Sequence, residues 1–166
     1  LESLRRFKPH TLSEVEEQII NLKNVNGPDA LNTLYDMITN KYLFRLEVGG
    51  EVKELTRAEL SAYRYSSSPA VREAAYRELH RVYAQDGAVL GQIYIHRARD
   101  WRSENMTLRH FDSPIAVQNL TNDIPDPVVE TLLEVSRQNV SVFQDYFRLK
   151  AGWLGMDKLR RFDLYA

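Results

Sequence analysis

The chain has 166 residues, and 22 lysines and arginines against 23 aspartates and glutamates give a formal net charge of −1. This length is sufficient for one domain with its own hydrophobic core, or for two small lobes that share one, and the near-neutral charge argues against a general nucleic-acid binder. The absence of cysteine excludes disulfide frameworks, thiol nucleophiles and cysteine-ligated zinc sites, and no apolar run approaches the roughly 20 residues that cross a bilayer.

The first part of the chain predicts two helices joined by a short turn. Overlapping capping boxes at residues 11–14 and 13–16 precede apolar residues at helical spacing. Gly27 and Pro28 restart the chain, because proline suits a first helical turn, and a second apolar stripe continues to Asn40.

Residues 42–55 follow a different period, since apolar and charged residues alternate on both sides of Gly49 and Gly50. Alternation around two glycines is typical of a β-hairpin with a tight turn. Thr56, with Glu59 three residues later, predicts the capping box of the next helix.

Ser68 and Pro69 predict the start of a long helix whose apolar face continues to Trp101. Gly87 weakens this helix, and the sequence leaves open whether the helix bends or breaks there.

A second long helix is expected in the last third of the chain. Residues 105–112 predict a loop and residues 113–122 a short helix. Asp126 is then expected to be the N-cap of a helix that continues to Leu154, with Gly155 as its C-cap. The predicted class is therefore all-α, a multi-helix lobe with two long helices and one small β-hairpin insertion near residues 42–55.

The histidines do not form a zinc-binding motif. A zincin site needs two histidines one helical turn apart with a glutamate between them, so that both rings reach one ion. The four histidines here are isolated in the sequence, which favours ordinary hydrogen-bonded side chains: His10, His80, His96 and His110.

Two pairs of nearby carboxylates are explained by helix starts. Glu16 with Glu17, and Asp123 with Asp126, are close enough to hold a divalent cation or to share acid and base roles. Acidic residues also favour the first turn of a helix, and this is the preferred interpretation.

Arginine-rich segments allow two interpretations. Residues 96–102, followed by Arg109 and His110, interleave arginine with tryptophan, which suits anion or base binding. Asp100 and Glu104 are close enough to form structural ion pairs with these arginines, and this is preferred. A second charged set indicates a solvated helix face: Arg72, Glu73, Arg77, Glu78 and Arg81.

Aromatic residues cluster near the end of the chain. Such a cluster suits either a binding groove or a packed interior, and helical spacing favours the interior. The residues are Phe143, Tyr146, Phe147, Trp153, Phe162 and Tyr165.

Several segments, taken in order, resemble the N-terminal portion of oligoendopeptidase F-like zinc metallopeptidases, relatives of thimet oligopeptidase. They are residues 9–17, Glu54-Leu55-Thr56, residues 69–75, residues 97–101 and residues 154–166. The last segment is similar to a tyrosine-aspartate-leucine-tyrosine-alanine junction of that family, with Phe162 in place of the first tyrosine.

The resemblance implies that residues 1–166 are the N-terminal helical region of a larger metallopeptidase. Residues 1–66 would form a helical hairpin plus the β-hairpin, and residues 67–166 the long-helix portion. The parent would be a zinc-dependent endopeptidase (oligopeptidase) that hydrolyses short peptides, with its HExxH zinc domain outside this chain. This chain would form a wall of the substrate channel and be inactive alone. The resemblance assigns no catalytic, cofactor-binding or metal-ligating residue here.

Further expectations concern partners and location. The expected partners are short peptide substrates and the catalytic lobe, with self-association through an apolar patch, and without nucleic acid or membrane. A cytoplasmic location is expected. The alternative is a non-enzymatic helical protein-interaction module that uses the aromatic groove near Phe143 and Phe147.

Overall fold

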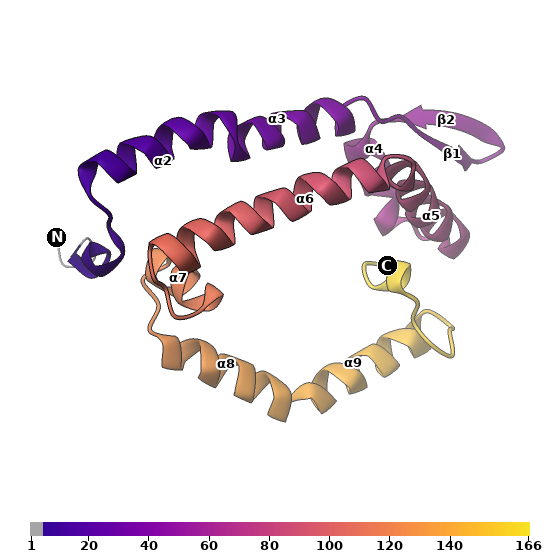
Figure 1. Ribbon diagram of the computed structural model, residues 1–166. Helices are drawn as coiled ribbons and strands as arrows, with labels where there is room; N and C mark the ends of the chain where they lie inside the picture. The colour runs from indigo at the N-terminus through magenta and orange to yellow at the C-terminus, as the bar shows by residue number, and fades with distance from the viewer. Residues whose placement is uncertain (1–4) are drawn as a thin grey trace. The chain divides into compact units, whose positions relative to one another are not determined.

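The computed structural model describes residues 5–166, and within them it is helical apart from one two-stranded hairpin (Figure 1). The predicted all-α class with a single hairpin insertion is confirmed. The main elements are α2 (Glu14–Asn26), α3 (Pro28–Thr39), β1 (Phe44–Val48), β2 (Glu51–Leu55), α4 (Arg57–Ala62), α5 (Pro69–Gln85), α6 (Gly87–Arg102), α7 (Pro114–Thr121), α8 (Asp126–Gln138) and α9 (Val140–Trp153). Short turns of helix complete them: η1 (Lys8–His10), η2 (Tyr63–Tyr65), η3 (Ser103–Leu108) and η4 (Arg161–Asp163).

By their backbone contacts, the described residues form two compact units. Unit 1 contains residues 5–35 and 91–139, and unit 2 contains residues 36–90 and 140–166. These units interleave along the chain, whereas the subdivision expected from the sequence is contiguous, with parts 1–66 and 67–166. That subdivision concerns a larger protein and stays a prediction.

Helix α2 begins at only one of its two candidate capping boxes. The Ser13 hydroxyl accepts from the Glu16 amide, and the Glu16 carboxylate accepts from the Ser13 amide, so this box is complete. Thr11 instead donates its hydroxyl proton to the carbonyl of Phe7. Gly27 alone separates α2 from α3, which confirms two helices joined by a short turn.

The first predicted long helix breaks. Helix α5 ends at Gln85, the next residue Asp86 leaves helical geometry with φ −106° and ψ 16°, and α6 begins at Gly87. The Tyr42 hydroxyl donates to the Asp86 carboxylate at 2.7 Å. This bond connects the residue between the two helices to the segment before β1. The long helix therefore breaks next to Gly87, where the sequence left a bend or a break open.

The second predicted long helix is also two helices, so the expectation of one continuous helix is wrong. Asn139 lies between α8 and α9 with φ −105° and ψ 15°. Its side-chain amide donates to the Val135 carbonyl at 2.8 Å, a local bond that competes with helix continuation. The end of α9 matches the prediction: Gly155 has φ +65°, and the Met156 amide donates to the Ala151 carbonyl at 2.9 Å.

Two smaller predictions are corrected by local hydrogen bonds. The expected loop at residues 105–112 begins instead as a turn of π-helix, η3, in which the Arg109 amide donates to the Glu104 carbonyl at 2.9 Å. Asp126 is the first residue of α8 rather than its N-cap, which is Pro125. The Asp126 carboxylate instead accepts from the Asn119 side-chain amide at 2.8 Å.

Unit 2 contains a core between the hairpin and the helices beside it. Strands β1 and β2 pair antiparallel with Val48 opposite Glu51, so Gly49 and Gly50 form a two-residue turn, and both have positive φ. Alternation places Phe44 and Leu46 on the same face, which packs on α5. Figure 1 shows the hairpin beside α4 and α5. The core consists of Phe44, Leu46, Leu55, Leu60, Ala75 and Val82.

No helix within residues 5–166 is long and apolar enough to span a membrane.

Candidate functional site

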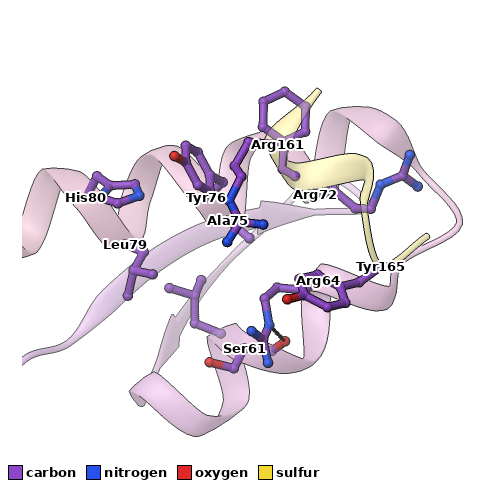
Figure 2. A pocket seen from close by; sticks show the side chains of 11 residues that line it. Ser61, Arg64, Arg72, Ala75, Tyr76, Leu79, His80, Arg161 and Tyr165 are labelled. Atoms are coloured by element: carbon purple, nitrogen blue, oxygen red, sulfur yellow. Dashed lines mark hydrogen bonds between the residues drawn. The ribbon is translucent and has the colours of Figure 1, made fainter. Parts of the chain in front are cut away.

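A cavity with a volume of about 250 Å³ lies within unit 2. Its walls come from α4 and η2, from one face of α5, and from η4 with the end of the chain (Figure 2). Segments nearly 100 residues apart in the sequence therefore meet around it. The lining residues are Leu60, Ser61, Arg64, Arg72, Ala75, Tyr76, Leu79, His80, Arg161, Phe162 and Tyr165.

A buried ion pair joins α5 to η4 beside this cavity. Arg72 and Asp163 are 1% and 0% exposed, and Arg72 Nη2 donates to Asp163 Oδ1 at 2.8 Å. Arg72 Nη1 donates to the Ser66 carbonyl at 2.7 Å, which ties the same guanidinium to the segment before α5. The prediction that Arg72 belongs to a solvated helix face is wrong, because the side chain is buried. Its partner, Asp163, is 91 residues away in sequence.

Asp163 is surrounded by hydrogen-bond donors. Besides Arg72, it accepts from Arg160 Nε at 2.8 Å and from the Arg160 amide at 3.1 Å. Burial alone would raise the pKa of Asp163, but the hydrogen bonds from Arg160 and Arg72 outweigh it and lower the pKa to about 2. The carboxylate is therefore charged at neutral pH, and it neutralises Arg72 beside the cavity.

Arg64 lines the cavity and is exposed, and it contacts an aromatic ring and a backbone carbonyl. Its guanidinium carbon is 5.4 Å from the centre of the Tyr165 ring, and Nε donates to the Ser61 carbonyl at 3.1 Å (Figure 2). Arg161 also lines the cavity, is exposed, and forms no ion pair or hydrogen bond with any described residue. None of the described residues that line the cavity is acidic.

The rest of the lining is apolar and aromatic. Leu60 and Ala75 are buried core residues, and Leu79 packs against the same core. The Tyr76 ring lies 5.7 Å from that of Phe162 and 4.4 Å from that of His80. The site therefore combines apolar and aromatic lining with two exposed arginines, Arg64 and Arg161, and this composition suits a ligand with one apolar group and one negative charge.

A second polar cluster lies within unit 1 and joins its two sequence segments, residues 5–35 and 91–139. Arg109 Nη1 and Nη2 donate to the two carboxylate oxygens of Glu17 at 2.7 and 2.9 Å, and Nε donates to Glu104 at 2.9 Å. His10 bonds the Arg109 carbonyl at 2.8 Å, and its ring stacks on Phe111 at 3.7 Å between ring centres.

This cluster is structural. Hydrogen bonds from Arg109 and from the Leu12 amide lower the pKa of Glu17 to about 2, and the bond to Glu17 raises the pKa of Arg109. Sequence predicted that Glu104 pairs with a nearby arginine, and it does. The Glu17 partner, 92 residues away, carried no sequence signal.

The other candidate residues do not converge on one site. Glu16 caps α2, while Asp123 pairs with Arg6 and Asp126 bonds Asn119. Of the described histidines, His10 is in the Arg109 cluster and His80 lines the unit 2 cavity. Residues 5–166 contain no group of three or more histidine, aspartate or glutamate side chains that could hold a metal ion.

The aromatic cluster is divided, and the expected interior packing is wrong for its helical part. Phe143 and Phe147 on α9 are 56% and 41% exposed. Phe162 and Tyr165 instead line the cavity.

Comparisons with known proteins assign the family. A model described as Peptidase family M3 matches residues 62–166, and one described as Oligopeptidase F matches residues 1–44. Group B oligopeptidase PepB of Streptococcus agalactiae is 27% identical over 96% of this chain, which covers 27% of that relative. An oligoendopeptidase F homolog of Lactococcus lactis subsp. lactis is 25% identical over 99% of this chain, which covers 28% of that relative.

Solved structures agree in fold. The crystal structure of oligoendopeptidase-F from Enterococcus faecium superposes with a TM-score of 0.85 at 22% identity, over 99% of this chain and 33% of that one. The chain spans about a quarter of the length of the curated relatives it matches. Since the family model covers more than half of its residues, the chain belongs to peptidase family M3.

Proposed function

We propose that this chain is a non-catalytic, N-terminal portion of a zinc-dependent oligopeptidase that hydrolyses short peptides. The observation that carries the proposal is the match to the family M3 model over residues 62–166, together with relatives named as oligopeptidases that align along nearly the whole chain. M3 is a metallopeptidase family. The coverage of 27–28% of those relatives supports the view that other residues supply the chemistry.

Zinc, in this proposal, is held by an HExxH segment outside these 166 residues. When bound, zinc polarises the scissile carbonyl and activates a water molecule. Two carboxylates of the polar clusters described above form ion pairs with arginines rather than facing a metal site: Glu17 pairs with Arg109, and Asp163 pairs with Arg72. The role proposed for this chain is to form one wall of the channel through which peptide substrates enter.

Exposed apolar helix faces support contact with a further lobe. In unit 1, Ile19 and Leu22 on α2 and Leu132 on α8 are all more than half exposed. Apolar side chains repeated along one helix face are unusual at a solvated surface and typical of an interface. We propose that the catalytic lobe covers such faces, and that without it the chain self-associates through them.

The test compares this chain with the polypeptide encoded when the reading frame is extended beyond Ala166. We expect the extension to contain HExxH, and the longer protein to cleave a quenched fluorescent peptide. The 166-residue chain is expected to leave the peptide intact. A longer protein with neither the motif nor peptidase activity would overturn the proposal.

One observation favours a second candidate, a helical interaction module. The aromatic face of α9 is exposed at Phe143, Tyr146 and Phe147, where a partner helix would find an apolar surface. This module and the oligopeptidase differ in the extended polypeptide, since only the oligopeptidase requires the zinc motif. The cytoplasmic location and the lack of nucleic-acid and membrane partners stay predictions.

A further inference from the structure

The cavity of unit 2 has the chemistry of a small acid-binding site. We propose that it binds the C-terminal residue of a short peptide, with the terminal carboxylate at Arg64 and Arg161 and an apolar side chain inserted against Leu79 and Phe162. This inference deepens the proposed function and rests on it, because it names a feature of the peptides that such an oligopeptidase would recognise.

The charges around the cavity point to an anion. Arg64 donates Nε to the Ser61 carbonyl, and its Nη1 and Nη2 atoms have no acceptor among the described residues. Arg161 likewise has no partner in that part of the chain. Arg72, the third arginine of the lining, is neutralised by Asp163. Two guanidinium groups therefore remain available, and guanidinium matches a carboxylate with paired hydrogen bonds.

The size and the apolar lining of the cavity restrict what accompanies that anion. A volume of about 250 Å³ lies below the roughly 300–1,000 Å³ of pockets for drug-sized ligands, so it suits a single residue better than a longer segment. The apolar lining at Leu60, Ala75 and Leu79 continues the hydrophobic core and disfavours a strongly hydrated anion such as free phosphate. The Phe162 and Tyr76 rings, 5.7 Å apart, offer aromatic surface to a large side chain.

Arg64 is held in place by two aromatic rings before any ligand binds. Tyr165 lies 5.4 Å from the Arg64 guanidinium, and Tyr65 lies 5.7 Å from it, so the cation is flanked by two rings. Tyr65 and Tyr165 also contact one another, with ring centres 6.1 Å apart. Restricting the side chain in this way lowers the entropy lost when a carboxylate binds.

The experiment measures binding of N-acetyl-alanyl-phenylalanine, as the free acid and as the C-terminal amide, to the 166-residue chain by titration calorimetry. Backbone amide NMR shifts would locate the bound peptide. We expect the acid to bind at least tenfold more tightly than the amide, since the amide lacks the charge that Arg64 and Arg161 recognise. Shifts should concentrate in α5 and residues 160–166.

Matched variants separate the site from general charge. Arg161→Gln and Arg64→Gln are each expected to weaken binding of the acid about tenfold. The control Arg148→Gln lies in the same unit, where Arg148 is exposed and, among residues 5–166, pairs only with Asp145, and it should leave the affinity unchanged. Circular dichroism verifies that each variant keeps its helices. Equal affinities for acid and amide, or equal effects of the three variants, would overturn the inference.

Two further arms identify the source of failure. If 3-phenylpropionate binds as tightly as the peptide acid, the cavity recognises small carboxylates and the peptide assignment is wrong. If the extended polypeptide cleaves peptides while this chain does not distinguish acid from amide, only the inference fails. If acid-selective binding occurs but the extended polypeptide lacks HExxH, the proposed peptidase function fails instead.

Discussion

Replacing Arg72 with methionine removes one partner of the buried ion pair and leaves Asp163 in the interior. Arg72 is 1% exposed and donates to Asp163 at 2.8 Å and to the Ser66 carbonyl at 2.7 Å. Removing one member of a buried pair costs about 3–5 kcal/mol, because the remaining charge is uncompensated. Arg160 still donates to Asp163, so we expect Arg72→Met to lower the free energy of unfolding by about 3 kcal/mol.

The assay is urea unfolding followed by circular dichroism at pH 7. Arg148→Met is the control, since Arg148 and Asp145 form an exposed pair, with side chains 72% and 71% exposed, whose loss costs less than about 1 kcal/mol. The double variant Arg72→Met/Asp163→Leu should be more stable than Arg72→Met, because it no longer buries a lone carboxylate. A loss for Arg72→Met no larger than that of the control would show that the buried pair does not stabilise the fold.

The pair also predicts how stability depends on pH. The pKa of Asp163 falls from its ordinary value of 3.8 to about 2 in the folded chain, so its contribution is fully present above 3.8 and is lost as the pH falls toward 2. The difference in stability between the natural chain and Arg72→Met should therefore narrow between about pH 5 and pH 2.

The remaining predictions concern other parts of the chain. Hydrogen bonds from Arg109, the larger contribution, and from the Leu12 amide lower the pKa of Glu17 to about 2, so Arg109→Gln should raise that pKa toward 4.5 as measured by carbon-13 NMR; an unchanged midpoint would show that Arg109 is not a cause. Gly50→Ala places a side chain at φ +84° and should lower the free energy of unfolding in urea by about 1 kcal/mol. Gly91→Ala, in open space on α6, should raise it by up to about 1 kcal/mol. The opposite order of the two variants would contradict the turn geometry. Sedimentation velocity should show self-association that increases with concentration and decreases in Leu132→Ser, and monomers at every concentration would count against exposed interface helices.

Local rules predicted the elements of the fold well. The capping boxes at Ser13 and Thr56, the turn at Gly49 and Gly50, and the C-cap at Gly155 all depend on residues within a few positions of one another. The break at Asn139 was missed because apolar residues continue with helical spacing across it. At this break the Asn139 side-chain amide donates to the Val135 carbonyl, a local bond that the spacing of apolar residues does not reveal.

The candidate site was less accessible to sequence reasoning because it is assembled across long separations. In the sequence, Arg72 has the spacing of a charged residue on a solvated helix face. Its burial is favourable because Asp163 of η4, far away in sequence, pairs with it. Nothing in the sequence near Glu17 indicates its ion pair with Arg109, which the structure shows. The helical spacing of Phe143 and Phe147 predicted interior packing, whereas the two side chains are exposed in the structure.

Zinc content and peptide hydrolysis, both measured in the 166-residue chain and in the polypeptide extended beyond Ala166, test whether this chain is a non-catalytic part of a zinc oligopeptidase. We expect about one zinc per molecule and cleavage of a short peptide for the extended protein, and neither for this chain. Stoichiometric zinc or peptide cleavage in the 166-residue chain would contradict this expectation.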